Sequence, residues 1–185
     1  MQVAQFDRSK TWTVEDYLQL DEGLLTQLIE GTLVMSPAPA FIHQQVLREL
    51  FLQLNTILDS GELVFAPTDL YIDEKNVLQP DLMFIAADNC HIITSRGVEG
   101  APDLVIEVLS PSNSFIDRNT KKRKCLSVGV KEYWLIDPVN RTLEVYKPAD
   151  LDTPSLYVVE SGAVSPTVFS NHSFEFADIF KFDKY

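Results

Sequence analysis

The sequence has few cysteines, no long hydrophobic run and no recognisable targeting segment. Its 185 residues include two cysteines, Cys90 and Cys125, which are far apart and outside any Cys/His ligand spacing. A structural zinc site and a disulfide are therefore not expected. The apolar runs are far too short to cross a bilayer, and residues 1–10 lack the apolar core of a signal peptide. We expect a cytoplasmic protein that has no membrane partner.

Basic residues are scarce as well. The chain has 15 Lys and Arg against 27 Asp and Glu, which gives a net charge of −12 at pH 7. This balance argues against a general nucleic-acid coat protein, because phosphate binding usually relies on surplus basic residues. It is compatible with an enzyme that has a local basic strip and holds metal ions in an acidic pocket. A glycine-rich phosphate loop and a GxSxG motif are also missing, which disfavours nucleotide hydrolysis and serine esterase chemistry.

The composition and the residue pattern predict one α/β domain over residues 1–185. Hydrophobic residues make up 45% and charged residues 23%, as in ordinary soluble globular proteins, and no repeat or linker divides the chain. Apolar residues at the helical period predict a long helix over residues 41–58, and a capping-box pattern predicts a short one at 13–17. Further helix is expected at 117–128, and strands at 28–35, 63–65, 69–73, 81–85, 103–109, 132–137, 142–147 and 155–160. Strands interspersed with helices indicate a domain built around one mixed sheet.

Glu107 lies in an unusual position, inside the apolar run of the segment PDLVIEVLSPS (residues 102–112). A carboxylate there is costly to bury unless it is paired. Asp103 faces the same side of the strand but lies roughly 13 Å away, at ~3.3 Å per residue, which is too far to share a metal ion. Asp81 begins another strand, and neighbouring strands are ~4.8 Å apart, so its carboxylate can meet that of Glu107. The alternatives for Glu107 are an ion pair with a basic residue and a metal site shared with Asp81.

The basic run after this strand offers a partner for the two acids. Lys121 and Lys122 flank the apolar side of the predicted helix, whereas Lys124 lies well away from it. Periodicity does not choose between Lys121 and Lys122. His43, on the apolar stripe of the long helix, is either a core histidine or a neighbour of the site.

Three segments of the sequence, PDLVIEVLSPS, DRNTKKRK and GVKEYWLIDP, resemble the Uma-type putative restriction endonuclease family of the PD-(D/E)xK nuclease superfamily. Further similarity runs from TVEDYLQL through LIEGTLVMSPAPAFIHQQV and NVLQPDLMFI to the C-terminal region. The resemblance implies a restriction-endonuclease-like fold, with a central mixed β-sheet flanked by helices. It also implies a site for a divalent metal ion, Mg²⁺ or Mn²⁺.

The family motifs can be placed residue by residue. The PD aspartate falls on Asp81 and the second acid on Glu107, and these would hold the ion with the main-chain carbonyl of Val108. The lysine of the family's D-R-x-x-K pattern falls on Lys121, which replaces the superfamily lysine two positions after the glutamate. The family histidine falls on His43 as a supporting residue.

The chain departs from the family at one position of the predicted site. Gln27 stands where the family commonly has a glutamate, in the segment QLIEG. Glu30 is close in sequence but would face the opposite side of a strand. We therefore include Gln27 and Glu30 as supporting residues of the site.

The expected function is metal-assisted hydrolysis of phosphodiester bonds, in DNA, with Arg118, Lys122 and Lys124 contacting backbone phosphates. The alternatives are a catalytically degenerate family member that binds DNA or protein, and an enzyme acting on RNA or another phosphate ester. By analogy, a homodimer would supply the two sites that cutting both strands of a duplex requires.

Overall fold

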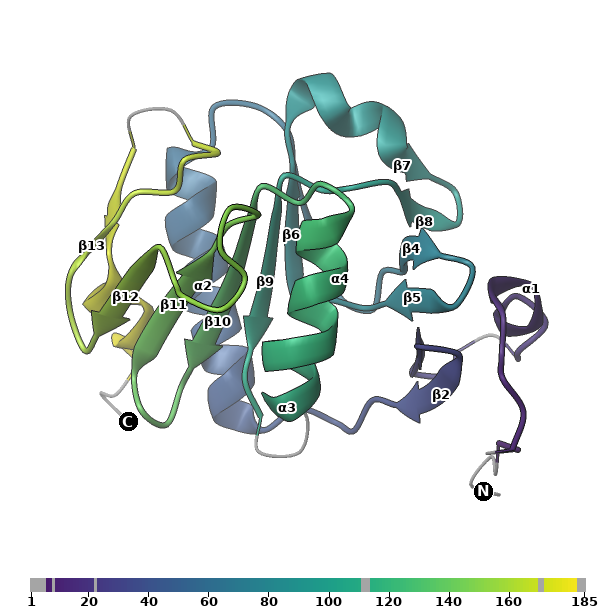
Figure 1. Cartoon of the computed structure of the whole chain (residues 1–185). Helices are drawn as coiled ribbons and strands as arrows, with labels where there is room; N and C mark the ends of the chain where they lie inside the picture. Colours follow the sequence, from purple (N-terminus) through teal and green to yellow (C-terminus); the bar gives the residue numbers. More distant parts are fainter. Residues whose placement is uncertain (1–5, 8, 22, 111–113, 170–171, 183–185) are drawn as a thin grey trace.

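The structure is a computed structural model that describes residues 6–7, 9–21, 23–110, 114–169 and 172–182. It contains two six-stranded mixed sheets. Figure 1 shows them with few accompanying helices. The α/β fold class is confirmed, but the expectation of one mixed sheet is wrong. The main sheet has the order β12-β11-β10-β9-β6-β3. Its strands are β3 (Glu62–Phe65), β6 (Leu82–Ile85), β9 (Leu104–Val108), β10 (Glu132–Asp137), β11 (Thr142–Tyr146) and β12 (Leu156–Val159). Only the β9–β10 pair of this sheet is parallel.

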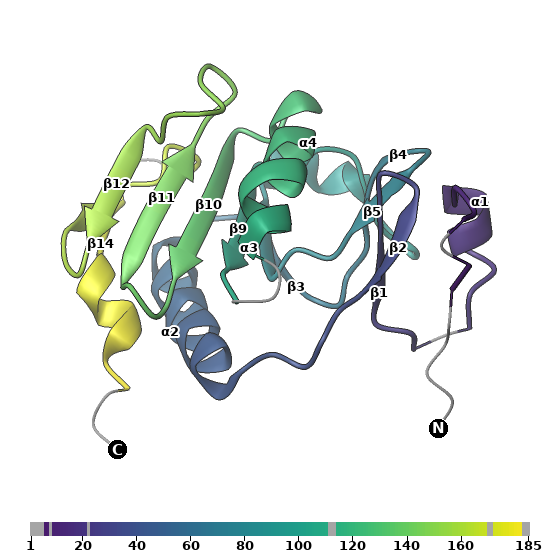
Figure 2. The same ribbon diagram turned by 60° about the horizontal axis from the view of Figure 1, so that its bottom comes forward.

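Two hydrophobic cores cover the two faces of the main sheet, because side chains alternate along each strand. One core packs Leu82, Ile106 and Trp134 against α2 (Phe41–Ile57), and it also includes the C-terminal 3-10 helix η3 (Phe176–Phe180). The other core packs the opposite face against α4 (Lys122–Ser127) and reaches residues of the second sheet. Figures 1 and 2 show α2 and α4 on opposite sides of the strands. The central strands of the main sheet are therefore covered by a helix on each face.

The second sheet has the order β2-β1-β5-β4-β8-β7. It consists of β1 (Thr26–Ile29), β2 (Thr32–Met35), β4 (Leu70–Asp73), β5 (Asn76–Leu78), β7 (Ile93–Thr94) and β8 (Gly97–Glu99). The predicted segment 28–35 is a β1–β2 hairpin. Strands β5, β7 and β8 were not predicted, because two or three residues are too few to show a period of two. A short 3-10 helix, η1 (Ala87–Ile92), connects β6 to β7, and β13 (Ala163–Val164) pairs with β14 (Phe174–Glu175).

Three helical segments follow one another after β9. They are α3 (Ser114–Ile116), a π-helical turn η2 (Asp117–Lys121) and α4. The prediction of a helix at 117–128 located this region but missed its first turn. A π-helical turn inside a helix is rare and often occurs at functional sites, and this one carries Asp117 and Lys121, both buried.

The predicted first helix is present as α1 (Val14–Tyr17), which begins with the expected capping box between Thr13 and Asp16. Cys90 and Cys125 are free thiols. Among the residues that the structure describes, no helix has the length and hydrophobicity needed to cross a membrane.

Candidate active site

The two acids of the predicted site lie beside each other on neighbouring antiparallel strands. Leu82 of β6 is opposite Ile106 of β9, and Met83 is opposite Val105. Continuing this register by one residue places Asp81 beside Glu107. The upstream PDL aspartate, and not Asp103, therefore accompanies Glu107.

Asp81 is held from two sides through one oxygen. Its Oδ2 accepts the backbone N–H of Val108 (2.7 Å) and lies 3.0 Å from Nε2 of His43. Because a carboxylate only accepts hydrogen bonds, this contact requires the proton of His43 to be on Nε2. His43 comes from the first turn of α2, so the long helix and strand β9 together fix the orientation of Asp81.

Glu107 is paired with Lys121 in the interior. The Lys121 ammonium donates to Glu107 Oε1 (2.8 Å) and lies 3.0 Å from Asp117 Oδ1, and the side chains of all three residues are at most 5% exposed. Lys122 instead lies over the ring of Tyr146, 3.7 Å from its centroid. In the structure, therefore, Lys121 and not Lys122 contacts Glu107, a choice that the residue pattern left open. Asp117 was not predicted as a site residue, although its i, i+4 spacing from Lys121 was a usable signal.

The buried charges at this site do not balance. Burial raises the pKa of Glu107 well above its ordinary value; the Lys121 ammonium opposes this, whereas Asp117 and Asp81 add to it. Burial likewise raises the pKa of Asp117. Burial alone would lower the pKa of Lys121, but the two flanking carboxylates outweigh it and raise that pKa, so the ammonium stays charged. Three carboxyl groups therefore lie near one ammonium, which contacts only Glu107 and Asp117, so acidic side chains outnumber basic ones at the site.

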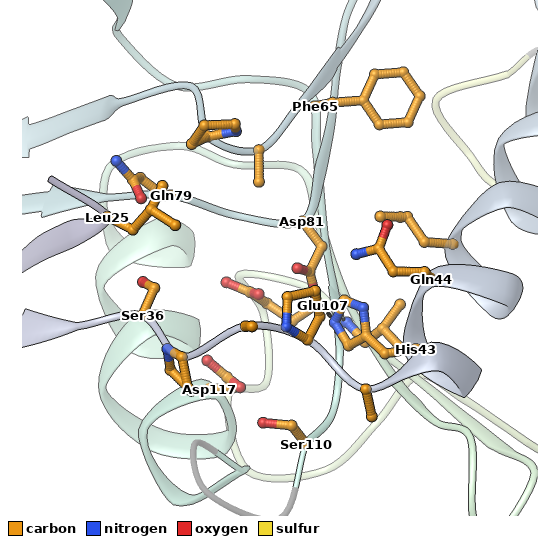
Figure 3. A pocket seen from close by; sticks show the side chains of 18 of the residues that line it. Leu25, Ser36, His43, Gln44, Phe65, Gln79, Asp81, Glu107, Ser110 and Asp117 are labelled. Atoms are coloured by element: carbon orange, nitrogen blue, oxygen red, sulfur yellow. Dashed lines mark hydrogen bonds and ion pairs between the residues drawn. The ribbon is translucent and has the colours of Figure 1, made fainter. Parts of the chain in front are cut away.

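These groups line a cavity of about 630 Å³, in which Figure 3 shows the carboxylates of Asp81, Glu107 and Asp117. One wall comes from α2 through His43 and Gln44. The remaining wall is formed by the segment after β2, the segment around Phe65, and Gln27, Gln79, Val108, Ser110 and Leu25.

The donor set fits a small divalent cation. Oxygen ligands suit Mg²⁺, which is usually held by one or two carboxylates and keeps several waters. Among the described residues, no group of three or more His, Cys, Asp or Glu is placed to hold an ion. Asp81 and Glu107 are a pair of carboxylates on neighbouring strands that line the cavity. Buried Oδ1 of Asp117 and Nδ1 of His43 have no hydrogen-bond partner among the described residues, although Asp117 Oδ1 contacts Lys121. Unmet polar capacity and the surplus of acidic side chains both favour a bound cation.

Gln27 lies in the cavity wall, whereas Glu30 does not. The Gln27 side chain accepts the backbone N–H of Gln79 (2.9 Å) and donates to Ser36 Oγ (3.1 Å). Glu30 is an exposed residue of the β1–β2 turn with φ of 50°, so the structure does not bring it to the site. Both hydrogen-bonding ends of the Gln27 amide are used within the protein.

A glutamate can replace Gln27 without losing these contacts, because the Ser36 hydroxyl can donate instead of accept. We expect Gln27→Glu to raise Mg²⁺ affinity on the order of tenfold, since affinity for such cations rises with ligand charge. Isothermal titration calorimetry measures the change, and Gln53→Glu, the same substitution outside the cavity, serves as the control. Equal Mg²⁺ affinity in wild type and Gln27→Glu would contradict the expectation.

The three basic residues expected at phosphates lie outside the cavity lining. Arg118 donates to Glu144 (2.6 Å), and Lys124 lies 3.5 Å from Asp73. Lys122 is buried, so the prediction that it contacts phosphate disagrees with its position. Its aliphatic stem and ammonium pack inward because it flanks the apolar side of the helix.

Asp103 has a structural environment at the other end of β9. It accepts from Lys131 (2.6 Å), the Ala86 N–H (2.8 Å) and Asn89 (3.1 Å). Burial works to raise the pKa of Asp103, but these hydrogen bonds outweigh burial and lower that pKa below its ordinary value. The second PD motif therefore anchors the strand and takes no part in the cavity.

The two mixed sheets and their flanking helices form an α/β protein with a restriction-endonuclease-like fold. Residues 14–170 match the Uma2 family, described as "Putative restriction endonuclease", and the chain belongs to this family. Its fold is similar to the crystal structure of a putative nuclease belonging to DUF820 from Anabaena variabilis ATCC 29413. The TM-score is 0.75 at 23% identity, with 91% of this chain and 97% of the other covered. No match was found among curated proteins.

Proposed function

We propose that the protein is a metal-dependent endonuclease that hydrolyses phosphodiester bonds, in DNA, in the cytoplasm. The observation that carries the proposal is the convergence of Asp81, Glu107 and Lys121 in one cavity at the paired ends of β6 and β9. Membership of a family described as restriction endonucleases supports the same reaction. The surplus of acidic side chains is compatible with a protein of net charge −12 acting on a polyanion, because a bound divalent cation reverses the local charge.

Each residue of the site has a role in this proposal. Asp81, Glu107 and the carbonyl of Val108 would hold Mg²⁺ or Mn²⁺. When bound, the ion supplies positive charge that activates a water molecule and stabilises the phosphate in the transition state. Lys121 orients the attacking water or offsets developing negative charge from its place beside Glu107. His43 is a positioning residue, because its contact with Oδ2 leaves the other oxygen of Asp81 for the ion.

The second candidate is a catalytically degenerate protein that binds a metal ion and a nucleic acid without cleaving it. Its support is Gln27, whose amide is neutral and internally hydrogen-bonded at the position where the family resemblance implies an acid. The two candidates agree on metal binding and differ in turnover.

Both candidates can be tested in a cleavage assay. Purified protein is incubated with supercoiled plasmid, single-stranded circular DNA or RNA, each in the presence of Mg²⁺, Mn²⁺ or EDTA. We expect cleavage of DNA with either cation and none in EDTA. In parallel, isothermal titration calorimetry measures whether the protein binds the same cations. Cation binding without cleavage of any substrate supports the degenerate candidate, and cleavage that persists in EDTA contradicts the metal-dependent one.

A further inference from the structure

A second cavity, of about 420 Å³, adjoins the candidate active site. The two cavities share three lining residues, Leu25, Pro67 and Gln79. The second one lies between the end of α1 and the second sheet, which are neighbours in Figures 1 and 2. The two cavities therefore adjoin at these residues, so neighbouring parts of one polymeric ligand could lie in both.

The polar part of the second cavity is an ordered network around Asp69. Its Oδ1 accepts from the Tyr17 hydroxyl (2.9 Å) and the Gln79 amide (2.9 Å), and its Oδ2 from the Tyr71 hydroxyl (3.3 Å). Gln79 belongs to both cavities, and its backbone N–H donates to Gln27. The network thus offers hydrogen-bonding groups and the half-buried ring of Tyr71, whereas Tyr17 is buried beneath it.

Arg96 adds a flat surface at the cavity rim. Its guanidinium donates twice to Glu99, from Nε (3.0 Å) and Nη2 (2.8 Å), and lies 5.7 Å from the centroid of the Tyr71 ring. The paired donors fix the plane, yet the side chain is 53% exposed. A planar, accessible guanidinium next to the Tyr71 ring is suited to stacking on a nucleobase.

The charge of the cavity decides which part of a nucleotide it takes. Glu99 balances Arg96, while Asp21 and Asp69 line the wall, so the cavity is net acidic. A phosphate is repelled there, whereas a neutral base with donor groups and two stackable faces is accommodated.

We propose that this cavity binds an unpaired nucleobase next to the phosphodiester held in the active-site cavity, an inference that rests on the proposed nuclease function. A base stacked and paired inside a duplex cannot enter a recessed cavity unless it leaves the stack. The preferred substrate is therefore single-stranded at the position beside the cut.

Binding tests the inference without any need for cleavage, both in EDTA and with Ca²⁺, another cation held by oxygen ligands, in place of Mg²⁺. Fluorescence anisotropy compares a labelled single-stranded DNA, the same strand containing abasic positions throughout its centre, and the matching duplex. We expect the single strand to bind most tightly. Arg96→Ala should weaken its binding about threefold to tenfold and Tyr71→Leu about fivefold to a hundredfold, the range of a lost base–aromatic contact. Neither variant should change binding of the abasic strand.

Two matched variants control for charge and for loss of an exposed aromatic ring. Arg123→Ala removes an exposed arginine that pairs with Asp152, and Tyr157→Leu removes an exposed tyrosine of β12. Neither residue lines either cavity, so binding should stay at the wild-type level in both.

The outcomes separate this inference from the nuclease proposal. Equal binding of duplex and single strand, or an Arg96→Ala effect that persists on the abasic strand, overturns the base cavity. Base-dependent binding without metal-dependent cleavage keeps the cavity and overturns the nuclease. Cleavage that requires Asp81 but shows no dependence on the flanking base keeps the nuclease and overturns the base cavity. Absence of nucleic-acid binding both in EDTA and with a divalent cation overturns both.

Discussion

Replacing Asp81 by asparagine is expected to reduce DNA cleavage at least about a hundredfold while the protein stays folded. The amide keeps a carbonyl oxygen that can accept the hydrogen bond from the Val108 N–H, so this local contact is preserved. It lacks the negative charge that a divalent cation requires, and loss of outer-shell partners alone typically costs 10- to 100-fold in metal affinity or activity. A hundredfold loss corresponds to about 2.7 kcal/mol of transition-state stabilisation. Initial rates with Mg²⁺, together with the free energy of unfolding in urea, measure both effects.

Asp103→Asn is the matched control, because it is the same substitution in the other PDL triplet. Cleavage should persist, since Asp103 does not line the cavity. Stability at pH 7 should fall by about 1–3 kcal/mol, because buried hydrogen bonds to a charged group are lost. Because the pKa of Asp103 is lowered in the folded protein, its contribution to the free energy of unfolding is fully present above its unfolded pKa. That contribution is lost as pH falls through its folded pKa, so the stabilities of wild type and Asp103→Asn should converge as pH falls below about 4. If the two substitutions reduce cleavage equally, the assignment of the catalytic aspartate is wrong.

The partnership of Asp81 and Glu107 could be predicted from the sequence because it depends on strand geometry. Spacing along one strand excluded Asp103, and β6 and β9 are neighbours in the sheet. The choice between Lys121 and Lys122 could not be made from periodicity, since both flank the apolar side of the helix. The family pattern favoured Lys121, and its two carboxylate contacts agree with that choice.

The second sheet and the role of Asp117 depend on tertiary contacts that leave little trace in the sequence. Strands β5, β7 and β8 are too short to show a pattern, and they are stabilised by pairing with β4 and with one another. Asp117 has the i, i+4 spacing from Lys121, but its burial within the π-helical turn is not indicated by periodicity, because such turns have no simple sequence pattern. Arg118, Lys122 and Lys124 were predicted to contact phosphates because they belong to a basic run. The sequence did not indicate the acidic partners of two of them: Arg118 pairs with Glu144, and Lys124 with Asp73.

Lys121→Met is expected to destabilise the metal-free protein by roughly 3–5 kcal/mol at pH 8. Removing one partner of a buried ion pair leaves the other charge uncompensated, which is the costly way to break such a pair. Here Glu107 and Asp117 both lose their shared cation in the interior. The folded protein then accommodates them only by taking up protons, so their already raised pKa values rise further.

The pH dependence of this loss has a definite sign. Carboxyl groups with raised folded pKa values contribute most stability below their unfolded pKa, near 4, and lose it as pH rises. The gap between wild type and Lys121→Met in urea unfolding with EDTA should therefore be smaller at pH 5 than at pH 8. Lys124→Met, whose ion pair with Asp73 is partly exposed, should cost less than about 1 kcal/mol at both. Adding Glu107→Gln to Lys121→Met should recover part of the loss, because one unpaired charge disappears. Equal losses in the two methionine variants would show that the buried acids do not depend on Lys121.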